Sequence, residues 1–330
     1  MTTVAFFNNK GGVGKTSLVY HLAWMFADIG KNVIAADLDP QANLTAMFID
    51  DDGIERLWND DNGATIYHAL TPLLNGTGDI SAPNPHQPTP GLSLITGDLR
   101  LSAAEDDLSS QWPLCLSSNE RAFRVISAFG RVLGMAAEAA DSSLVLVDVG
   151  PNLGALNRSA LVAADYVVVP LAPDPYSLQG LRNLGPTLTR WRSEWRQRLD
   201  NDPPSDLVMP DGRMEPLGYV VMQHAMRLDR PVQAYARWME RIPRVYAETV
   251  AQTDASPAFD TDDDINCLGT LKHFRSLMPY AQDARKPMFK LTAADGAVGG
   301  RVKAVRGCYD EFYDLAQVIA DRARFDLHPR

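Results

Sequence analysis

A glycine-rich segment near the N-terminus contains the residue types that bind phosphate. Residues 8–17 read Asn-Asn-Lys-Gly-Gly-Val-Gly-Lys-Thr-Ser. Glycine has no Cβ, so successive backbone N–H groups can turn toward an anion, and a helix beginning at Lys15 adds its positive dipole end. We expect Lys15 to reach the β- and γ-phosphates and the Thr16 hydroxyl to bind Mg²⁺. The nucleotide contacts predicted from this loop are Lys10, Gly11, Gly12, Val13, Gly14, Lys15, Thr16 and Ser17.

Acidic residues follow two other apolar segments. Asp37 ends the run Asn-Val-Ile-Ala-Ala-Asp and Asp39 comes directly after it, while Asp148 ends the run Leu-Val-Leu-Val-Asp. In an open α/β sheet, ligands bind at the carboxyl ends of the strands, so these carboxylates should face the nucleotide. An aspartate that ends a core strand is typical of a Walker B motif, which holds the water shell of the metal.

A parallel sheet is needed to bring these residues together. An apolar run over 3–7, a helix from Lys15 and a strand over 32–37 form a βαβ unit. The predicted fold class is therefore α/β, a mostly parallel twisted sheet with helices on both faces, of the P-loop NTPase type. We expect one ATPase domain over 1–330, with loop insertions near 50–64, 75–91, 200–215 and 252–266.

Periodicity and turn residues indicate the remaining elements. The acidic stretch 50–62 is interpreted as a solvated loop, and Pro186 predicts a kink or a break in its helix. The arginines of that helix are interpreted as a solvated face. Strands are expected over 92–96 and 217–223, and helices over 65–74, 121–140, 177–199, 230–241 and 307–324.

Composition limits the partners of the protein. The chain has 330 residues and a net charge of −10, so binding to nucleic acid or acidic lipid would need a local basic patch. Cys115, Cys267 and Cys308 are far apart and form no Cys-x-x-Cys pair, which indicates reduced thiols. We see no signal peptide and no apolar run of membrane-spanning length, and we expect a soluble cytoplasmic protein.

The phosphate-binding loop departs from the ordinary Walker A pattern at two positions. Asn9 stands where the first glycine would be, and a second lysine, Lys10, is at the loop entrance. The loop resembles the deviant signature K-G-G-x-G-K-[TS] of the ParA/Soj/MinD group of ATPases. The segment from Asp37 to Thr45 matches the D-x-D-P-Q-x-N-x-T segment of that family. The resemblance extends from Val4 to about Ala320 and is interrupted by loops.

The resemblance implies roles for individual residues. Lys10 would cross a dimer interface to the nucleotide of the partner, and Asp39 would position and activate the attacking water. The implied catalytic residues are Lys10, Lys15 and Asp39. The implied Mg²⁺ site contains Thr16, Asp37, Asp39 and Asp148. Gln223, Met278 and Pro279 lie where family members contact adenine. The expected cofactors are therefore ATP or ADP, and Mg²⁺ at the implied metal site.

The resemblance also implies a function. ATP would close a homodimer that binds non-specific DNA on the nucleoid, and a ParB-like or other adaptor would stimulate hydrolysis and release it. The segment 272–306 contains eight basic and two acidic residues, a net charge of +6. The candidate DNA contacts are Lys272, Arg275, Arg285, Lys286, Lys290, Arg301, Lys303 and Arg306.

Two other functions remain open at this point. A MinD-like membrane ATPase needs a C-terminal amphipathic helix with a basic polar face. The helix over 307–324 instead has Asp310, Glu311, Asp314 and Asp321 on its polar side, which disfavours membrane binding. A P-loop enzyme with a metabolic or redox substrate is the third possibility, although the three cysteines lie outside the motifs. No residue indicates which cargo a positioning ATPase would carry.

Overall fold

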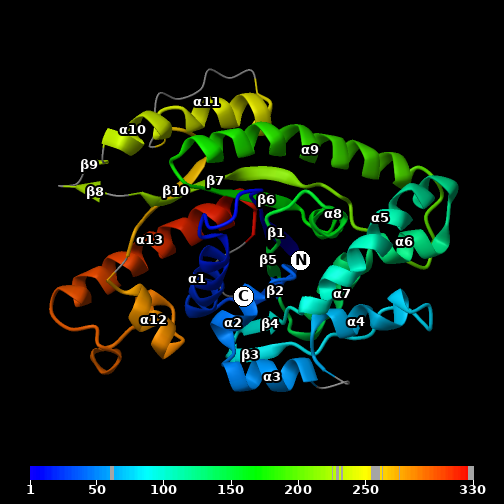
Figure 1. Cartoon of the computed structure of the whole chain (residues 1–330), viewed down its shortest axis with the longest axis horizontal. Helices are drawn as coiled ribbons and strands as arrows, with labels where there is room; N and C mark the ends of the chain where they lie inside the picture. The colour runs from blue at the N-terminus through cyan, green and yellow to red at the C-terminus, as the bar shows by residue number, and fades with distance from the viewer. Residues whose placement is uncertain are drawn as a thin grey trace.

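The computed structural model describes residues 1–59, 63–224, 226–227, 230–231, 233–253, 261, 263–274 and 276–325. Helices and strands alternate along most of the chain (Figure 1). In chain order they are β1 (Thr2–Phe6), α1 (Lys15–Asp28), β2 (Val33–Asp37), α2 (Asn43–Phe48), α3 (Asp51–Asn59), α4 (Ile66–Leu74), β3 (His86–Thr89), β4 (Leu92–Ile95), α5 (Ala104–Leu114), α6 (Glu120–Ile126), α7 (Ala128–Ala139), β5 (Leu144–Asp148), α8 (Ala155–Val162), β6 (Tyr166–Leu171), α9 (Pro175–Leu199), β7 (Glu215–His224), β8 (Met226–Arg227), β9 (Arg230–Pro231), α10 (Gln233–Met239), α11 (Ile242–Tyr246), β10 (Cys267–Lys272), α12 (Met278–Ala284) and α13 (Gly300–Arg322).

A central sheet organises the molecule. Its eight strands run in the order β10-β7-β6-β1-β5-β2-β4-β3. All neighbouring pairs are parallel except β3 and β4, which are antiparallel. Helices cover both faces, with α1 and α13 on one side and α7, α8 and α9 on the other (Figure 1). The predicted fold class is confirmed.

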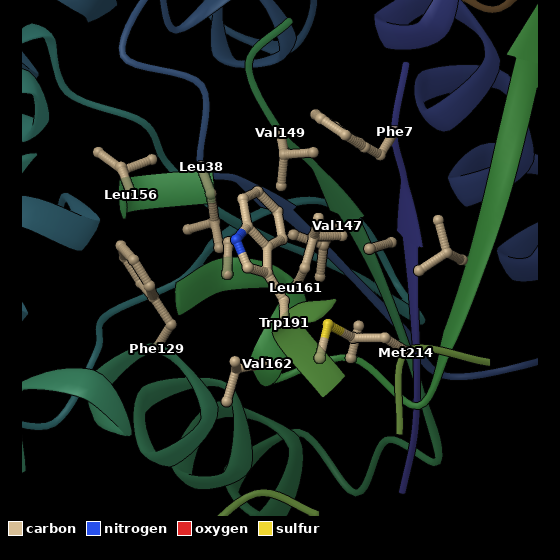
Figure 2. Packing of buried hydrophobic residues seen from close by; sticks show 14 of the residues in the cluster. Phe7, Leu38, Phe129, Val147, Val149, Leu156, Leu161, Val162, Trp191 and Met214 are labelled. Carbon is tan, nitrogen blue, oxygen red and sulfur yellow. The ribbon is translucent and has the colours of Figure 1, made fainter. Parts of the chain in front are cut away.

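Each face of the sheet has its own apolar core, because successive side chains of a strand point to opposite faces. In β1, Val4 and Phe6 belong to the cluster shared with α1 and α13. Ala5 and the following Phe7 belong to the cluster shared with α7, α8 and α9. Figure 2 shows that second cluster, with Trp191 of α9 surrounded by side chains from the strands and α8. Burying these side chains is the main driving force for this arrangement.

The register of three strands brings the predicted site residues together. Phe6 at the end of β1 is paired with Asp148 at the end of β5. Asp148 is in turn paired with Asp37 at the end of β2. The phosphate-binding loop and the two carboxylates therefore emerge side by side from the same edge of the sheet, as the sequence predicts.

Two predicted loops contain regular structure. The expected solvated loop over 50–62 was wrong, because residues 51–59 form α3. Its acidic first turn, Asp51 and Asp52, and its basic last turn, Arg56, match the helix dipole, so the charges that indicated a loop stabilise a helix. The region 75–91 contains the short strand β3. Residues 200–214, where a loop insertion was expected, contain no helix or strand. Most of the insertion expected near 252–266 lies outside the described residues.

Several helix boundaries also differ from the prediction. The helix expected over 121–140 is divided into α6 and α7 at Ser127, whose hydroxyl donates to the Phe123 carbonyl oxygen at 2.7 Å. The break expected at Pro186 does not occur, and α9 continues through it to Leu199. Pro186 lies on the exposed side of α9, where water can satisfy the carbonyl left without an N–H partner. The helix expected over 230–241 begins only at Gln233, and α13 begins at Gly300, earlier than predicted.

The sequence patterns also missed α5 and misjudged one part of α9. Residues 104–114 form α5, for which no element was predicted. The arginines of α9 were expected on a solvated face, but Arg198 is buried and its Nε donates to the Trp112 carbonyl oxygen at 2.8 Å. The second difference follows from the first, because α5 packs beside α9 and covers part of its surface (Figure 1).

Candidate functional site

The loop between β1 and α1 has the backbone geometry of an anion-binding turn. Gly12 and Gly14 have φ angles of 74° and 90°, a left-handed conformation that glycine adopts without strain. Gly14 is the N-cap residue of α1 and has no side chain that could cap the helix. The first turn of α1 also contains no acidic residue. Its N–H groups and positive dipole end are therefore suited to a phosphate.

A pocket of about 710 Å³ opens over this loop. That volume is within the range of small-molecule sites. Predicted nucleotide contacts from Lys10 to Ser17 all line the pocket, as does Met278, whereas Pro279 is absent from its walls. The side chain of Gln223 lies outside the described residues. The other residues that line the pocket are Tyr20, His21, Asp39, Gln41, Asn43, Ala46, Met47, Pro151, Ala281, Gln282, Arg285, Lys286 and Met288.

Asp148 is the buried anion beneath the loop. Its side chain is fully buried, and Lys15 Nζ donates to its Oδ1. Its Oδ2 is buried without a hydrogen-bond partner among the described residues. Burial raises the pKa of Asp148, and the charge of Lys15 opposes this effect. An orphaned carboxylate oxygen beside Thr16 fits a Mg²⁺ ion or one of its waters.

Asp37 is a second buried carboxylate with a different set of partners. Its Oδ2 accepts hydrogen bonds from the backbone N–H and the hydroxyl of Thr45, both at 2.8 Å. Burial and the neighbouring charge of Asp148 raise the pKa of Asp37 to about 7. Thr45 therefore occupies Oδ2 of Asp37, and Oδ1 accepts the Asp39 N–H at 3.3 Å.

Asp39 is the carboxylate that faces the pocket. It lines the cavity, and its Oδ1 accepts a hydrogen bond from the Gln41 N–H at 3.0 Å. Gly150, in the segment that follows β5, lies so close that an added Cβ would be 3.4 Å from Asp39 Oδ1. Asp39 is therefore placed where a carboxylate could hold a water molecule against a bound phosphate.

The described residues do not form an all-protein metal cage. No group of three or more His, Cys, Asp or Glu side chains in this part of the chain could hold a metal ion by itself. Mg²⁺ usually binds one or two carboxylates and takes its other ligands from substrate phosphates and water. Of the predicted metal residues, Thr16 and Asp148 fit that pattern most directly.

Lys10 projects from the loop entrance toward the N-terminus of α9. Its ammonium group forms an ion pair with Asp174 and lies 5.8 Å from the ring centroid of Tyr176. Asp174 also caps α9 by accepting the Ser177 N–H at 2.9 Å. Tyr176 is 74% exposed, so this group of residues lies at the molecular surface beside the pocket.

Two residues for which no role was predicted, Asn8 and Thr45, fix the backbone around the site. Asn8 is buried and donates from Nδ2 to the Pro170 carbonyl oxygen at 2.7 Å, fixing the loop entrance to the end of β6. Thr45 connects Asp37 to Gly97, whose N–H donates to its hydroxyl at 2.7 Å. Thr45 is the last residue of the motif that begins at Asp37, so that motif was the sequence signal that could have identified it.

His21 joins the two walls of the pocket. Its Nδ1 lies 2.7 Å from the Ser17 carbonyl oxygen, and its Nε2 accepts the Met288 N–H at 3.1 Å. The imidazole is therefore neutral, with its proton on Nδ1. Burial lowers the pKa of His21 to about 4. No sequence signal indicates this contact, because Met288 is far away in the chain.

The basic residues proposed for DNA binding are largely paired with acids. Lys272 pairs with Glu311 at 3.1 Å, Lys286 with Asp295 at 2.8 Å, and Lys290 with Asp28 at 2.6 Å. A looser pair joins Arg285 to Asp51 at 3.7 Å, and Arg301 stacks on the ring of Tyr280 at 4.6 Å. Lys303 and Arg306 are exposed on α13, with no ion pair to another described residue. Arg275 lies outside the described residues.

The apolar face of α13 is used inside the molecule. Phe312, Leu315 and Ile319 are buried against α1 and the sheet. The apolar side of α13, which a membrane would have to bind, is therefore already buried in the core. None of the helices among the described residues has the length and apolar character needed to cross a membrane. The thiol of Cys267 donates to the Gly269 carbonyl oxygen at 3.7 Å, and Cys115 and Cys308 are buried.

Comparisons with known proteins agree with this geometry. A family model described as an AAA domain matches residues 1–201. The chain is 30% identical over 200 residues to the chromosome partitioning protein ParA of Caulobacter vibrioides, covering 61% of this chain and 67% of that protein. A crystal structure of a protein from Corynebacterium diphtheriae is similar with a TM-score of 0.68 and 23% identity, covering 98% of each chain. A putative plasmid partition protein from Borrelia burgdorferi, bound to AMPPNP, has a TM-score of 0.60 and 17% identity, covering 97% of this chain and 98% of that one.

Proposed function

The chain belongs to the ParA-type P-loop ATPases, and on that premise we propose that it is an ATP-dependent positioning switch. It would bind ATP with Mg²⁺, close into a homodimer around two nucleotides, and hydrolyse ATP slowly. In the cytoplasm the ATP-bound dimer would associate with non-specific DNA, and an adaptor protein would stimulate hydrolysis and release it. Nucleotide would thus set which of two states is populated.

The observation that carries the proposal is the placement of three charged groups: Lys15 and Asp39 line one pocket, and Asp148 is buried against Lys15. Lys15 and Asp148 form a buried ion pair under the glycine-rich loop, and Asp39 faces the cavity from the neighbouring strand. A triphosphate bound on the loop would form an ion pair with the Lys15 ammonium. Mg²⁺ would be held by Thr16 and by the carboxylate oxygen of Asp148 that has no hydrogen-bond partner among the described residues. Asp39 would then orient the attacking water, as a general base or by hydrogen bonding.

The exposure of Lys10 supports the dimer. Its ammonium lies at the surface beside the exposed ring of Tyr176, although it also lines the pocket. A side chain in this position can leave Asp174 and reach a second chain that packs over the pocket mouth. Completion of each site by the Lys10 of the partner would make hydrolysis depend on dimerisation.

We further propose that residues 1–330 form one ATPase domain. One continuous sheet takes β1 from the start of the chain and β10 from residues 267–272, and α13 packs against α1. The pocket itself combines the loop after β1 with Met278 and Met288. The C-terminal third would therefore complete the nucleotide site, which supports a single unit.

Three single substitutions test the proposal by size-exclusion chromatography and ATPase assay. Asp39→Ala should bind ATP, accumulate as a dimer and lose about 100-fold or more in kcat, because it removes the group that orients water. Lys15→Ala should bind no ATP and remain a monomer. Lys10→Ala should bind ATP, remain a monomer and hydrolyse it poorly.

The same experiment can contradict each part of the proposal. An Asp39→Ala protein that stays monomeric with saturating ATP would remove the assigned role of Asp39. Wild-type turnover by Lys10→Ala would remove the shared site while leaving a nucleotide-binding protein. Asp283→Ala, an exposed substitution outside the pocket walls, is the control and should match the wild type.

A further inference from the structure

The segment 149–154 connects β5 to α8 and borders the catalytic pocket. It follows Asp148 directly, and its Pro151 lines the pocket. Gly150 approaches Asp39 so closely that an added Cβ would lie 3.4 Å from Oδ1. A shift of this segment would therefore change the space in which Asp39 can hold a water molecule.

Both ends of the segment are attached to the apolar core. Val149 and Leu156 point into the cluster around Trp191 (Figure 2). Asn157, the residue after Leu156, donates from Nδ2 to the carbonyl oxygens of Gly150 and Asn152, at 2.8 Å and 2.7 Å. Asn157 lies on α8, so the position of the first turn of α8 determines the position of the segment.

The first turn of α8 is held by a carboxylate from another helix. Glu105, at the start of α5, accepts the Ala155 N–H through Oε1 at 2.6 Å and the Leu156 N–H through Oε2 at 2.8 Å. Its negative charge also lies at the positive end of the helix dipole. Gly154 permits this approach, because a Cβ there would lie 2.6 Å from Oε1 of Glu105.

A second contact attaches the other end of α5. Trp112 lies between the guanidinium groups of Arg158 on α8 and Arg198 on α9, each 4.1 Å from the ring centroid. Its Nε1 donates to Glu194 Oε2 at 3.2 Å. The hydrogen bond to Glu194 joins α5 to α9, whereas Glu105 holds the turn of α8 at which the segment ends. The two ends of α5 can therefore be tested separately.

We propose that Glu105 is a positioning residue for ATP hydrolysis. It lines no part of the pocket and acts through the backbone of Ala155 and Leu156, which fixes α8, Asn157 and the segment beside Asp39. The proposal rests on the ATPase function given above. Loss of this hold should affect the chemical step more than ATP binding, because the glycine-rich loop belongs to a different element.

Steady-state kinetics test this role with a matched pair of variants. Glu105→Gln keeps the shape of the side chain but replaces one acceptor oxygen by a donor and removes the charge. We expect kcat to fall about tenfold while KM for ATP changes less than about twofold, which indicates lost transition-state positioning. Glu105→Asp, which keeps the charge, should recover part of kcat. Glu194→Gln alters the hydrogen bond between α5 and α9 and should retain wild-type kcat.

Hydrogen exchange gives a second readout that does not depend on turnover. Amides of 149–158 should exchange faster in Glu105→Gln than in the wild type or Glu194→Gln, with AMPPNP bound and at equal thermal stability. Unchanged kcat and unchanged exchange in Glu105→Gln would overturn the proposal, as would an equal fall in kcat for Glu194→Gln. A wild-type protein that does not hydrolyse ATP would refute the proposed function instead, and the exchange measurement would still decide the role of Glu105.

Discussion

At the scale of single residues, the site contains more buried negative charge than the protein itself neutralises. Asp37 and Asp148 are paired across neighbouring strands and both are fully buried, while Lys15 is the one cation that an ion pair links to either of them within the described residues. Burial raises both pKa values; the charge of Asp148 adds to this effect at Asp37, whereas at Asp148 the charge of Lys15 opposes it. Such an arrangement favours a bound divalent cation, which would stabilise the ionised forms. The same logic does not extend to His21, whose surroundings favour its neutral form.

His21 should make the free energy of unfolding depend on pH. Its pKa is lowered from 6.5 to about 4 in the folded protein, so the unfolded chain takes up a proton first as the pH falls. Its contribution to stability is complete above about pH 6.5 and is lost progressively down to about pH 4, by up to about 3 kcal/mol. Urea unfolding at intervals from pH 7.5 to 4.5 measures this. His21→Gln, which cannot titrate, should show a smaller slope in that window, and equal slopes would contradict the assignment.

At the scale of elements, local signals predicted what depends on one segment of chain and missed what depends on packing between segments. Strand ends carrying Asp37 and Asp148, and the glycines before Lys15, follow from residue types at short spacing, and the structure confirms their placement. The helix α5 has only weak apolar periodicity and is stabilised by contacts to α8 and α9, which a sequence pattern does not reveal. The contact of His21 with Met288 was equally inaccessible, since it spans 267 positions.

The packing of α9 against residues 247–251 depends on one glycine. A Cβ at Gly185 would lie 1.7 Å from the Thr249 carbonyl oxygen, and that atom belongs to the backbone. Gly185→Ala should therefore force the two segments apart and destabilise the protein by about 1–3 kcal/mol or more. Gly134→Ala on α7 is the matched control, because a Cβ there meets nothing within 4 Å, and it should stabilise the helix by about 1 kcal/mol. Thermal unfolding of both variants gives the comparison, and equal melting temperatures would contradict the close approach.

At the scale of the whole molecule, net charge and local charge act in opposite directions. The chain carries −10 overall, so DNA would be repelled except where cations remain available. Ion pairs to acids outside the segment engage Lys272, Arg285 and Lys290, so the +6 of the segment overstates its attraction for phosphate. The sequence shows how many cations this segment contains. It does not reveal their partners, because Glu311, Asp28 and Asp51 lie outside the segment on other elements.

Among the described cations of this segment, Lys303 and Arg306 should therefore carry most of any DNA affinity. If an ATP-bound dimer places these two cations of each chain on phosphates, log K should fall against log salt concentration with a slope of about −4, at about −0.9 per phosphate. Retardation of random duplex DNA by Asp39→Ala with ATP, at several salt concentrations, measures the slope. Adding Lys303→Ala and Arg306→Ala should abolish most of it, whereas Lys272→Ala should change it little because Glu311 already neutralises that lysine. A larger loss from Lys272→Ala than from the double substitution would place the DNA surface on the β10 side of α13 instead.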